Sequence, residues 1–220
     1  MSTQSTGYLE AAAELPPGGR LTLYGVSWEE YEQLLGELGD DYHVRISFND
    51  GQLEIMSPSD VHENLKNLTH DLLITISDEL QQDILSFGSW TLKLDPTRKG
   101  AEADDCFYIQ NADVVQGRTR LDLAADPPPD LVIEIDLSSE SSSKLAIYNA
   151  LGVPEVWHYS SGRWRFLQLV DGAYSSVSRS VAFPFISPDD IASFVANSKV
   201  KGPLKARSEF RESIKRRRPL

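Results

Sequence analysis

The 220-residue sequence contains a single cysteine, Cys106. One cysteine forms no internal disulfide and does not supply the several thiolates of a structural zinc site. No apolar run approaches the roughly 20 residues that a membrane-spanning helix needs. The first ten residues lack the basic start and apolar stretch of a secretory signal. These absences predict a protein without membrane segments that works in a reducing cytoplasm.

Several common catalytic motifs are also missing. The sequence has no G-x-x-x-x-G-K-[ST] phosphate loop, no G-x-G-x-x-G dinucleotide fingerprint and no G-x-S-x-G nucleophile elbow. The string His62-Glu63-Asn64-Leu65-Lys66 is not a zinc-protease motif, because Lys66 stands where the second histidine is required. Nucleotide-loop, Rossmann and serine-hydrolase chemistry are therefore not indicated.

Basic residues are scarce outside the carboxy-terminal end. The net charge is −12, yet positions 199–220 hold nine Lys and Arg against two acids, which leaves positions 1–198 with a net charge of −19. An acidic body is a poor match for a polyanion, and the basic end would supply the missing attraction. The alternative is a solvated charged tail without a partner. We expect a flexible lead at 1–20, one domain at 21–197 and a flexible basic tail at 198–220.

The folded part has the composition of a globular protein, with 40% hydrophobic and 25% charged residues. Apolar periodicity predicts helices at 28–38, 58–80 and 142–151. The first has a capping box at Ser27, and Ser57 is the expected cap of the second. Predicted strands are 44–48, 53–56, 84–87, 90–94, 104–109, 130–136, 156–159 and 164–170. This order indicates an α/β fold with a mixed central sheet flanked by helices.

Two acids stand in the most apolar predicted strand, at Glu134 and Asp136. Their spacing of two places both carboxylates on one face of the sheet. Burying adjacent carboxylates is costly unless a cation compensates, and hard oxygen ligands suit magnesium or manganese. The alternative is that the strand has already ended and that Asp136 only begins a polar loop. We therefore expect a metal site that includes Glu134 and, if the strand continues, Asp136.

Lys144 is the second residue that is unusual for a core. On a helical wheel it shares one stripe with Ile147, Tyr148 and Leu151, which should face the sheet. It also lies in the first turn of the predicted helix, where the helix dipole disfavours a cation. Carboxylates and a phosphate opposite Lys144 would explain its place. The alternative is a lysine whose stem follows the surface to solvent.

Two weaker candidates complete the set. Alternation along the strand at 104–109 directs Asp104 and Asp105 to opposite faces, so one of them points toward each layer. His62 lies near the edge of the apolar stripe of the helix at 58–80, which makes it able to approach a site. A histidine at such a boundary is also common without any catalytic role.

Taken together, six segments resemble the Uma2 family of endonuclease-like proteins, also described as a domain of unknown function common in cyanobacteria. They are DGQLEIMSP at 50–58, His62-Glu63, GAEADDCFYI at 100–109, PDLVIEI at 129–135, KLAIY at 144–148 and GVPEVW at 152–157. The resemblance covers about residues 45–160. It implies a restriction-endonuclease-like core, a mixed sheet with flanking helices.

By this resemblance, Asp104 is the first metal-binding acid and Glu134 the second. The usual lysine of the fold lies two residues after the second acid, where this sequence has Asp136. Lys144 matches the position to which the lysine has moved in this family. Ala103 replaces the proline that often precedes the first acid.

The first functional hypothesis is a magnesium-dependent endonuclease acting on DNA, with manganese as the alternative metal. Asp104 and Glu134 would hold the metal, helped by Asp136 or the carbonyl of Ile135, while Lys144 orients or deprotonates a water and His62 contacts the phosphate or tunes an acid. Cleavage of both strands of a duplex favours a two-fold homodimer. A second hypothesis is a non-hydrolytic protein that binds nucleic acid or a protein partner. A third is hydrolysis of RNA or of a nucleotide.

Overall fold

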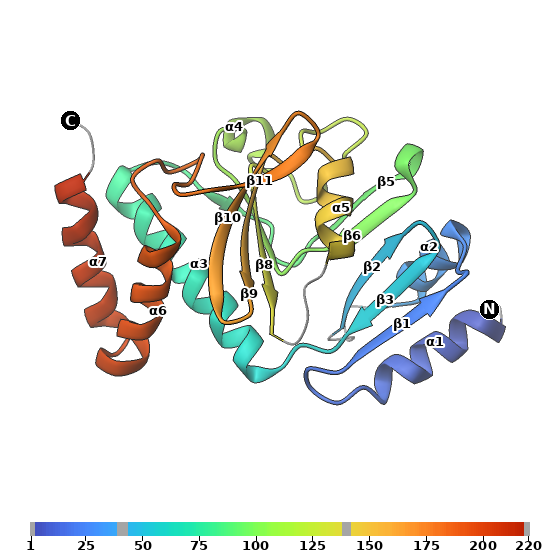
Figure 1. Cartoon of the computed structure of the whole chain (residues 1–220). Coiled ribbons are helices and arrows are strands. Elements are labelled where there is room, and N and C mark those ends of the chain that lie inside the picture. The colour runs from blue at the N-terminus through green and yellow to red at the C-terminus, as the bar shows by residue number, and fades with distance from the viewer. Residues whose placement is uncertain (1–2, 39–43, 138–141, 218–220) are drawn as a thin grey trace.

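The computed structural model describes residues 3–38, 44–137 and 142–217, and Figure 1 shows their arrangement. The helices are α1 (Thr3–Ala13), α2 (Trp28–Glu37), α3 (Asp60–Leu80), α4 (Ala112–Val115), α5 (Ser142–Ala150), α6 (Pro188–Lys201) and α7 (Pro203–Arg217), with a 3-10 turn η1 (Asp95–Thr97). The strands are β1 (Arg20–Tyr24), β2 (Arg45–Asn49), β3 (Gln52–Met56), β4 (Leu85–Ser86), β5 (Thr91–Leu94), β6 (Lys99–Glu102), β7 (Asp105–Tyr108), β8 (Leu131–Asp136), β9 (Glu155–Ser160), β10 (Arg163–Val170) and β11 (Ala173–Val177).

The strands form two sheets. The first is antiparallel, with the order β1-β3-β2-β6-β5. The second has the order β11-β10-β9-β8-β7-β4 and is mixed, because β8 and β9 run parallel while its other pairs are antiparallel. Parallel neighbours need a crossover connection, and α5 provides it between β8 and β9. The predicted α/β class, with a mixed sheet and flanking helices, is confirmed.

Three apolar clusters separate the layers. Helices α1 and α2 cover the outer face of the first sheet, where Tyr31 and Leu34 pack on β2 and β3. Helix α5 lies between the two sheets, since Ile147 and Tyr148 contact apolar residues of both. Helices α3, α6 and α7 cover the far face of the second sheet (Figure 1). The two sheets meet at the segment that joins β6 to β7.

The long helix α3 begins two residues later than the sequence indicated. Ser59, not Ser57, is its cap, because the Ser59 side chain accepts a hydrogen bond from the His62 backbone N–H. Val61, predicted to lie on the apolar stripe, is 58% exposed, whereas His62 is buried. The first turn of α3 therefore directs a polar side chain toward the protein interior.

Both end segments that the sequence predicted to be flexible contain a helix. Helix α7 occupies most of the predicted flexible tail and buries Ala206, Phe210 and Ile214, one residue per turn. Its Arg207 bonds Asp71 of α3 at 2.9 Å. At the other end, α1 packs on α2. Helices thus occupy 3–13 and 203–217, within the segments for which the sequence predicted flexibility. The division at 20 and 198 stays a prediction.

Candidate active site

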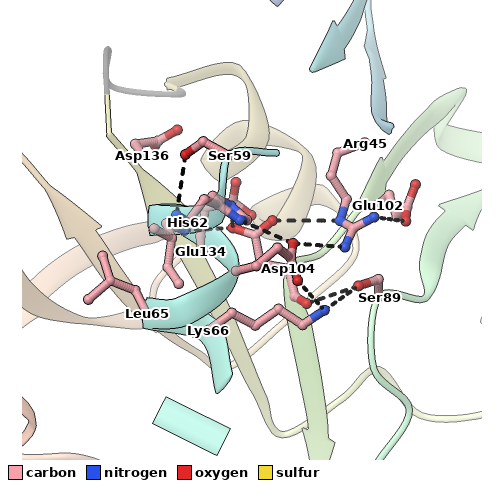
Figure 2. Close-up of polar contacts among 12 residues, drawn as sticks. Arg45, Ser59, His62, Leu65, Lys66, Ser89, Glu102, Asp104, Glu134 and Asp136 are labelled. Atoms are coloured by element: carbon pink, nitrogen blue, oxygen red, sulfur yellow. Dashed lines mark hydrogen bonds and ion pairs between the residues drawn. The ribbon is translucent and has the colours of Figure 1, made fainter. Parts of the chain in front are cut away.

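Four of the predicted residues converge where the two sheets meet, and Figure 2 shows three of them, His62, Asp104 and Glu134. Asp104 lies between β6 and β7, Glu134 in β8, Lys144 in α5 and His62 in the first turn of α3. Their exposed fractions are 0%, 1%, 2% and 3%. Two acids, an amine and an imidazole thus share one buried region, from elements far apart in sequence.

Glu134 is held by two groups of α5. Lys144 Nζ lies 2.5 Å from Glu134 Oε1, and the Tyr148 hydroxyl donates to Oε2 at 2.8 Å. Lys144 and Tyr148 are four residues apart, so they lie on one face of the helix. Lys144 also donates to the Glu102 carbonyl at 3.4 Å. Its burial rules out the alternative in which the lysine reaches solvent.

Asp104 has one satisfied oxygen and one that accepts no hydrogen bond. Oδ2 accepts from the Ile135 backbone N–H at 2.7 Å and lies 3.0 Å from His62 Nε2. Oδ1 is buried without a hydrogen bond, and its charged neighbour is Arg45 Nε at 3.9 Å. The backbone of β8 thus fixes Asp104 next to Glu134, and one lone-pair-bearing oxygen remains available.

Burial and charge shift the pKa values in this region in consistent directions. Burial, together with the charges of Asp104 and Asp136, raises the pKa of Glu134 to about 8 against the opposing effect of Lys144. Burial disfavours ionised Asp104, but Lys144, His62 and the Ile135 N–H outweigh it and lower its pKa. Burial also opposes charge on Lys144, yet Glu134 and Asp104 raise its pKa. Asp104 is thus the acid of this region whose ionised form is favoured, whereas ionisation of Glu134 is disfavoured by burial and by the neighbouring acids.

Asp136 lies on the same face of β8 but has other partners. Its Oδ2 lies 2.8 Å from His158 Nε2, and its Oδ1 lies 3.4 Å from Arg20 Nη2, which belongs to β1. Arg165 lies 3.5 Å from His158 Nδ1. Among the described residues, no group of three or more His, Cys, Asp and Glu side chains is placed to hold a metal ion. Asp136 thus contacts His158 and Arg20, and its role as a metal ligand stays a prediction.

Two residues of the site were missed from the sequence. The sequence placed Tyr148 on the same buried stripe as Lys144, and their i, i+4 spacing already indicated that the two side chains lie side by side on the helix. Arg45 of β2 gave no signal, because its partners lie far along the chain: Nη1 is 3.1 Å from Glu102 Oε1, and Nη2 is 3.5 Å from Glu63 Oε1.

The side chains present could supply two carboxylate ligands to a hard divalent cation, but not a complete set of protein ligands. Magnesium is commonly bound by one or two carboxylates, with waters and substrate phosphates as its other ligands. The unbonded Asp104 Oδ1 and the carboxylate of Glu134 match that pattern. The adjoining cavity, lined by Arg20, Ser59 and His62 among others, measures about 20 Å³, enough for roughly one water. A phosphodiester therefore does not fit beside His62 in this conformation.

Comparisons with known proteins show the family and the fold of this chain. The Uma2 family model, described as "Putative restriction endonuclease", matches residues 28–196. The fold is similar to the crystal structure of "a putative nuclease belonging to DUF820" from Anabaena variabilis, with a TM-score of 0.54 and 12% identity, covering 77% of this chain and 99% of that one. At that identity the likeness concerns the fold alone. No curated protein matches the sequence. No helix within the described ranges is long and apolar enough to cross a membrane.

Proposed function

The chain belongs to the Uma2 family and has a restriction-endonuclease-like fold, and from this premise we propose that it is a magnesium-dependent endonuclease acting on DNA. The observation that supports the proposal is the buried group of Asp104, Glu134 and Lys144, in which Lys144 Nζ contacts Glu134 at 2.5 Å and Asp104 Oδ1 accepts no hydrogen bond. Manganese is the alternative metal.

Each side chain has a separate task in this proposal. Asp104 Oδ1 and Glu134 would hold the metal, which when bound polarises a phosphate oxygen and lowers the pKa of a coordinated water. Lys144 keeps its proton, because the neighbouring acids raise its pKa, so it offsets negative charge that develops on the phosphate. His62 orients Asp104 from the side of α3.

The test is plasmid cleavage in magnesium and in manganese by the parent protein and two conservative variants, Asp104→Asn and Glu134→Gln. Asp105→Asn is the matched control, because Asp105 is an equally buried neighbouring acid whose side chain bonds His70 and Ser86 instead. We expect cleavage by the parent and the control, and a loss of at least about 100-fold in both site variants. Equal cleavage by all four proteins would remove these carboxylates from the mechanism.

A second function has one observation in its favour. The candidate site is closed, since Asp104, Glu134 and Lys144 are nearly inaccessible to solvent. A protein that binds nucleic acid or a protein partner without hydrolysis needs no open site. Salt-sensitive DNA binding by the parent, without cleavage in any divalent metal, would favour this function over the first.

A further inference from the structure

A cleft of about 770 Å³ lies next to the candidate site. It lies between β5 with the turn before it, α2 and the segment 119–121, and its walls are Glu32, Leu35, Gly36, Phe87, Ser89, Trp90, Thr91, Lys93, Thr119, Arg120 and Leu121. Small-molecule sites in proteins commonly measure about 300–1,000 Å³. The cleft is thus large enough for a nucleotide, which the cavity beside His62 is not.

Hydrogen bonds join one wall of the cleft to the segment between β6 and β7 that contains Asp104. The Ser89 hydroxyl donates to the Asp104 carbonyl at 3.1 Å, and the Ala103 N–H donates to the Trp90 carbonyl at 3.3 Å. Lys66 Nζ in turn donates to Ser89 Oγ at 3.1 Å, as Figure 2 shows. A ligand in the cleft therefore lies against residues that contact the backbone of the first acid.

Two aromatic rings line the same wall. Trp28, Trp157 and Trp164 are buried, whereas the Trp90 side chain is partly exposed. The rings of Phe87 and Trp90 have centroids 6.1 Å apart at an interplanar angle of 47°, so they do not stack on each other. The indole of Trp90 thus offers a surface on which a planar ligand can stack.

The lining also includes a cation that is not neutralised within the described part of the chain. Arg120 is exposed and makes no hydrogen bond or ion pair within the described part of the chain. Lys93, by contrast, bonds Glu32 at 2.5 Å. Thr91 and Thr119 add hydroxyls to the lining. Together, the cleft has a stacking surface, a free guanidinium and hydrogen-bonding groups.

We propose that this cleft binds an unpaired nucleotide of a nucleic-acid strand, with its base stacked on Trp90 and its phosphate near Arg120. A base stacks on an indole only when it has left its own neighbours, so the preferred ligand is a single strand and not a duplex. The proposal rests on the proposed function, which it deepens by naming the form of nucleic acid that approaches Asp104.

The test is binding of a fluorescein-labelled 12-nucleotide single strand to the full chain, in low salt with EDTA, followed by anisotropy. Intrinsic fluorescence is a second readout, since Trp90 is the accessible tryptophan and a stacked base quenches it. We expect Trp90→Leu and Arg120→Ala each to weaken binding about 10-fold, because stacking on an aromatic ring contributes strongly to the affinity for each base. Trp90→Phe keeps a ring and should restore much of the affinity.

Matched controls are Tyr24→Leu, which removes an exposed aromatic ring outside the lining of the cleft, and Arg163→Ala, which removes an exposed guanidinium outside it. Both should bind like the parent, and a duplex of the same sequence should bind less tightly. Absence of binding by the parent, equal affinity in all variants, or tighter binding of the duplex would overturn the proposal.

Failure of this inference and failure of the proposed function have different signatures. Binding in EDTA needs no cleavage, so Trp90-dependent binding without any nuclease activity would remove only the proposed function. Cleavage by the parent, with single-strand binding that is unchanged in Trp90→Leu and Arg120→Ala, would remove only the cleft proposal.

Discussion

Lys144 Nζ lies 2.5 Å from Glu134 Oε1, and neither side chain is more than 3% exposed. This ion pair joins α5 to the central strand β8. A buried pair contributes little net stability over an apolar pair of the same shape, but an isolated member of it is costly.

At pH 9, above the raised pKa of Glu134, Lys144→Met should lower the free energy of unfolding by about 3–5 kcal/mol, because ionised Glu134 is left buried without its counter-ion. The double variant Lys144→Met with Glu134→Gln should recover a large part of that loss, since no uncompensated charge remains. Urea unfolding of the parent, both single variants and the double variant gives the coupling free energy. Additive effects of the two substitutions would contradict a direct pair.

The Tyr148 hydroxyl supports the other oxygen of Glu134, at 2.8 Å. Tyr148→Phe should cost about 1–3 kcal/mol, because a buried acceptor loses its donor. If Glu134 binds metal, the variant should also weaken metal affinity about 10- to 100-fold, as the loss of groups that orient metal ligands generally does. Urea unfolding and a metal titration measure the two effects.

Tyr174→Phe is the matched control for this substitution. Tyr174 also donates one hydrogen bond, to the Val153 carbonyl at 2.7 Å, but it lies in β11. The variant Tyr174→Phe should therefore be less stable than the parent but should bind metal equally well. An equal loss of metal affinity in both variants would show that Tyr148 acts only through the stability of the fold.

The sequence indicates the centre of this site better than its surroundings. Glu134 and Lys144 are recognisable because charged residues stand in apolar patterns of a strand and a helix, and that anomaly is local. The pairing of Arg45 with Glu102 joins residues 57 positions apart, and no local period contains it. Alternation along a strand predicts which face of the sheet a side chain occupies, but not its partners. Asp136 shares a face with Glu134, yet its oxygens contact His158 and Arg20.

Strand β6 was not predicted, because the contact that explains its sequence is also made with a distant part of the chain. Its sequence, Lys99-Gly100-Ala101-Glu102, lacks the β-branched and aromatic residues that identify a strand. The structure explains Gly100, because any Cβ there would collide with the hydroxyl of Tyr31 on α2. The residue is small because of a distant ring. Helix α7 was missed for a different reason, because its three buried side chains are separated by charged residues.

His70 of α3 and Asp105 of β7 form a pair that should make the stability of the protein depend on pH. His70 Nδ1 lies 2.8 Å from Asp105 Oδ2, and this hydrogen bond is the main cause that raises the pKa of His70. A raised pKa in the folded state stabilises the fold below the unfolded value of about 6.5, and the gain disappears as pH rises through the folded value.

The parent should therefore exceed His70→Gln in free energy of unfolding by more at pH 5.5 than at pH 9. Urea unfolding at the two pH values measures the difference for each protein. His70 is about half buried, so solvent screening keeps the effect modest. A difference that grows toward high pH would contradict the sign of the argument.

The metal itself gives the last prediction, and it can be checked without any nuclease activity. A ligand that binds only the folded state at 100 times its Kd adds about 2.7 kcal/mol to the free energy of unfolding. For a chain of this size, that corresponds to a rise in Tm of about 5–10 °C. Asp104→Asn should abolish the rise in magnesium or manganese at constant ionic strength, because Asp104 Oδ1 is a buried carboxylate oxygen beside Glu134 that accepts no hydrogen bond. Asp105→Asn should keep the rise, since the oxygens of Asp105 are occupied by His70, Ser86 and the Cys106 N–H. The same metal-induced rise in both variants would mean that the cation binds elsewhere, and the two-carboxylate site would have to be abandoned.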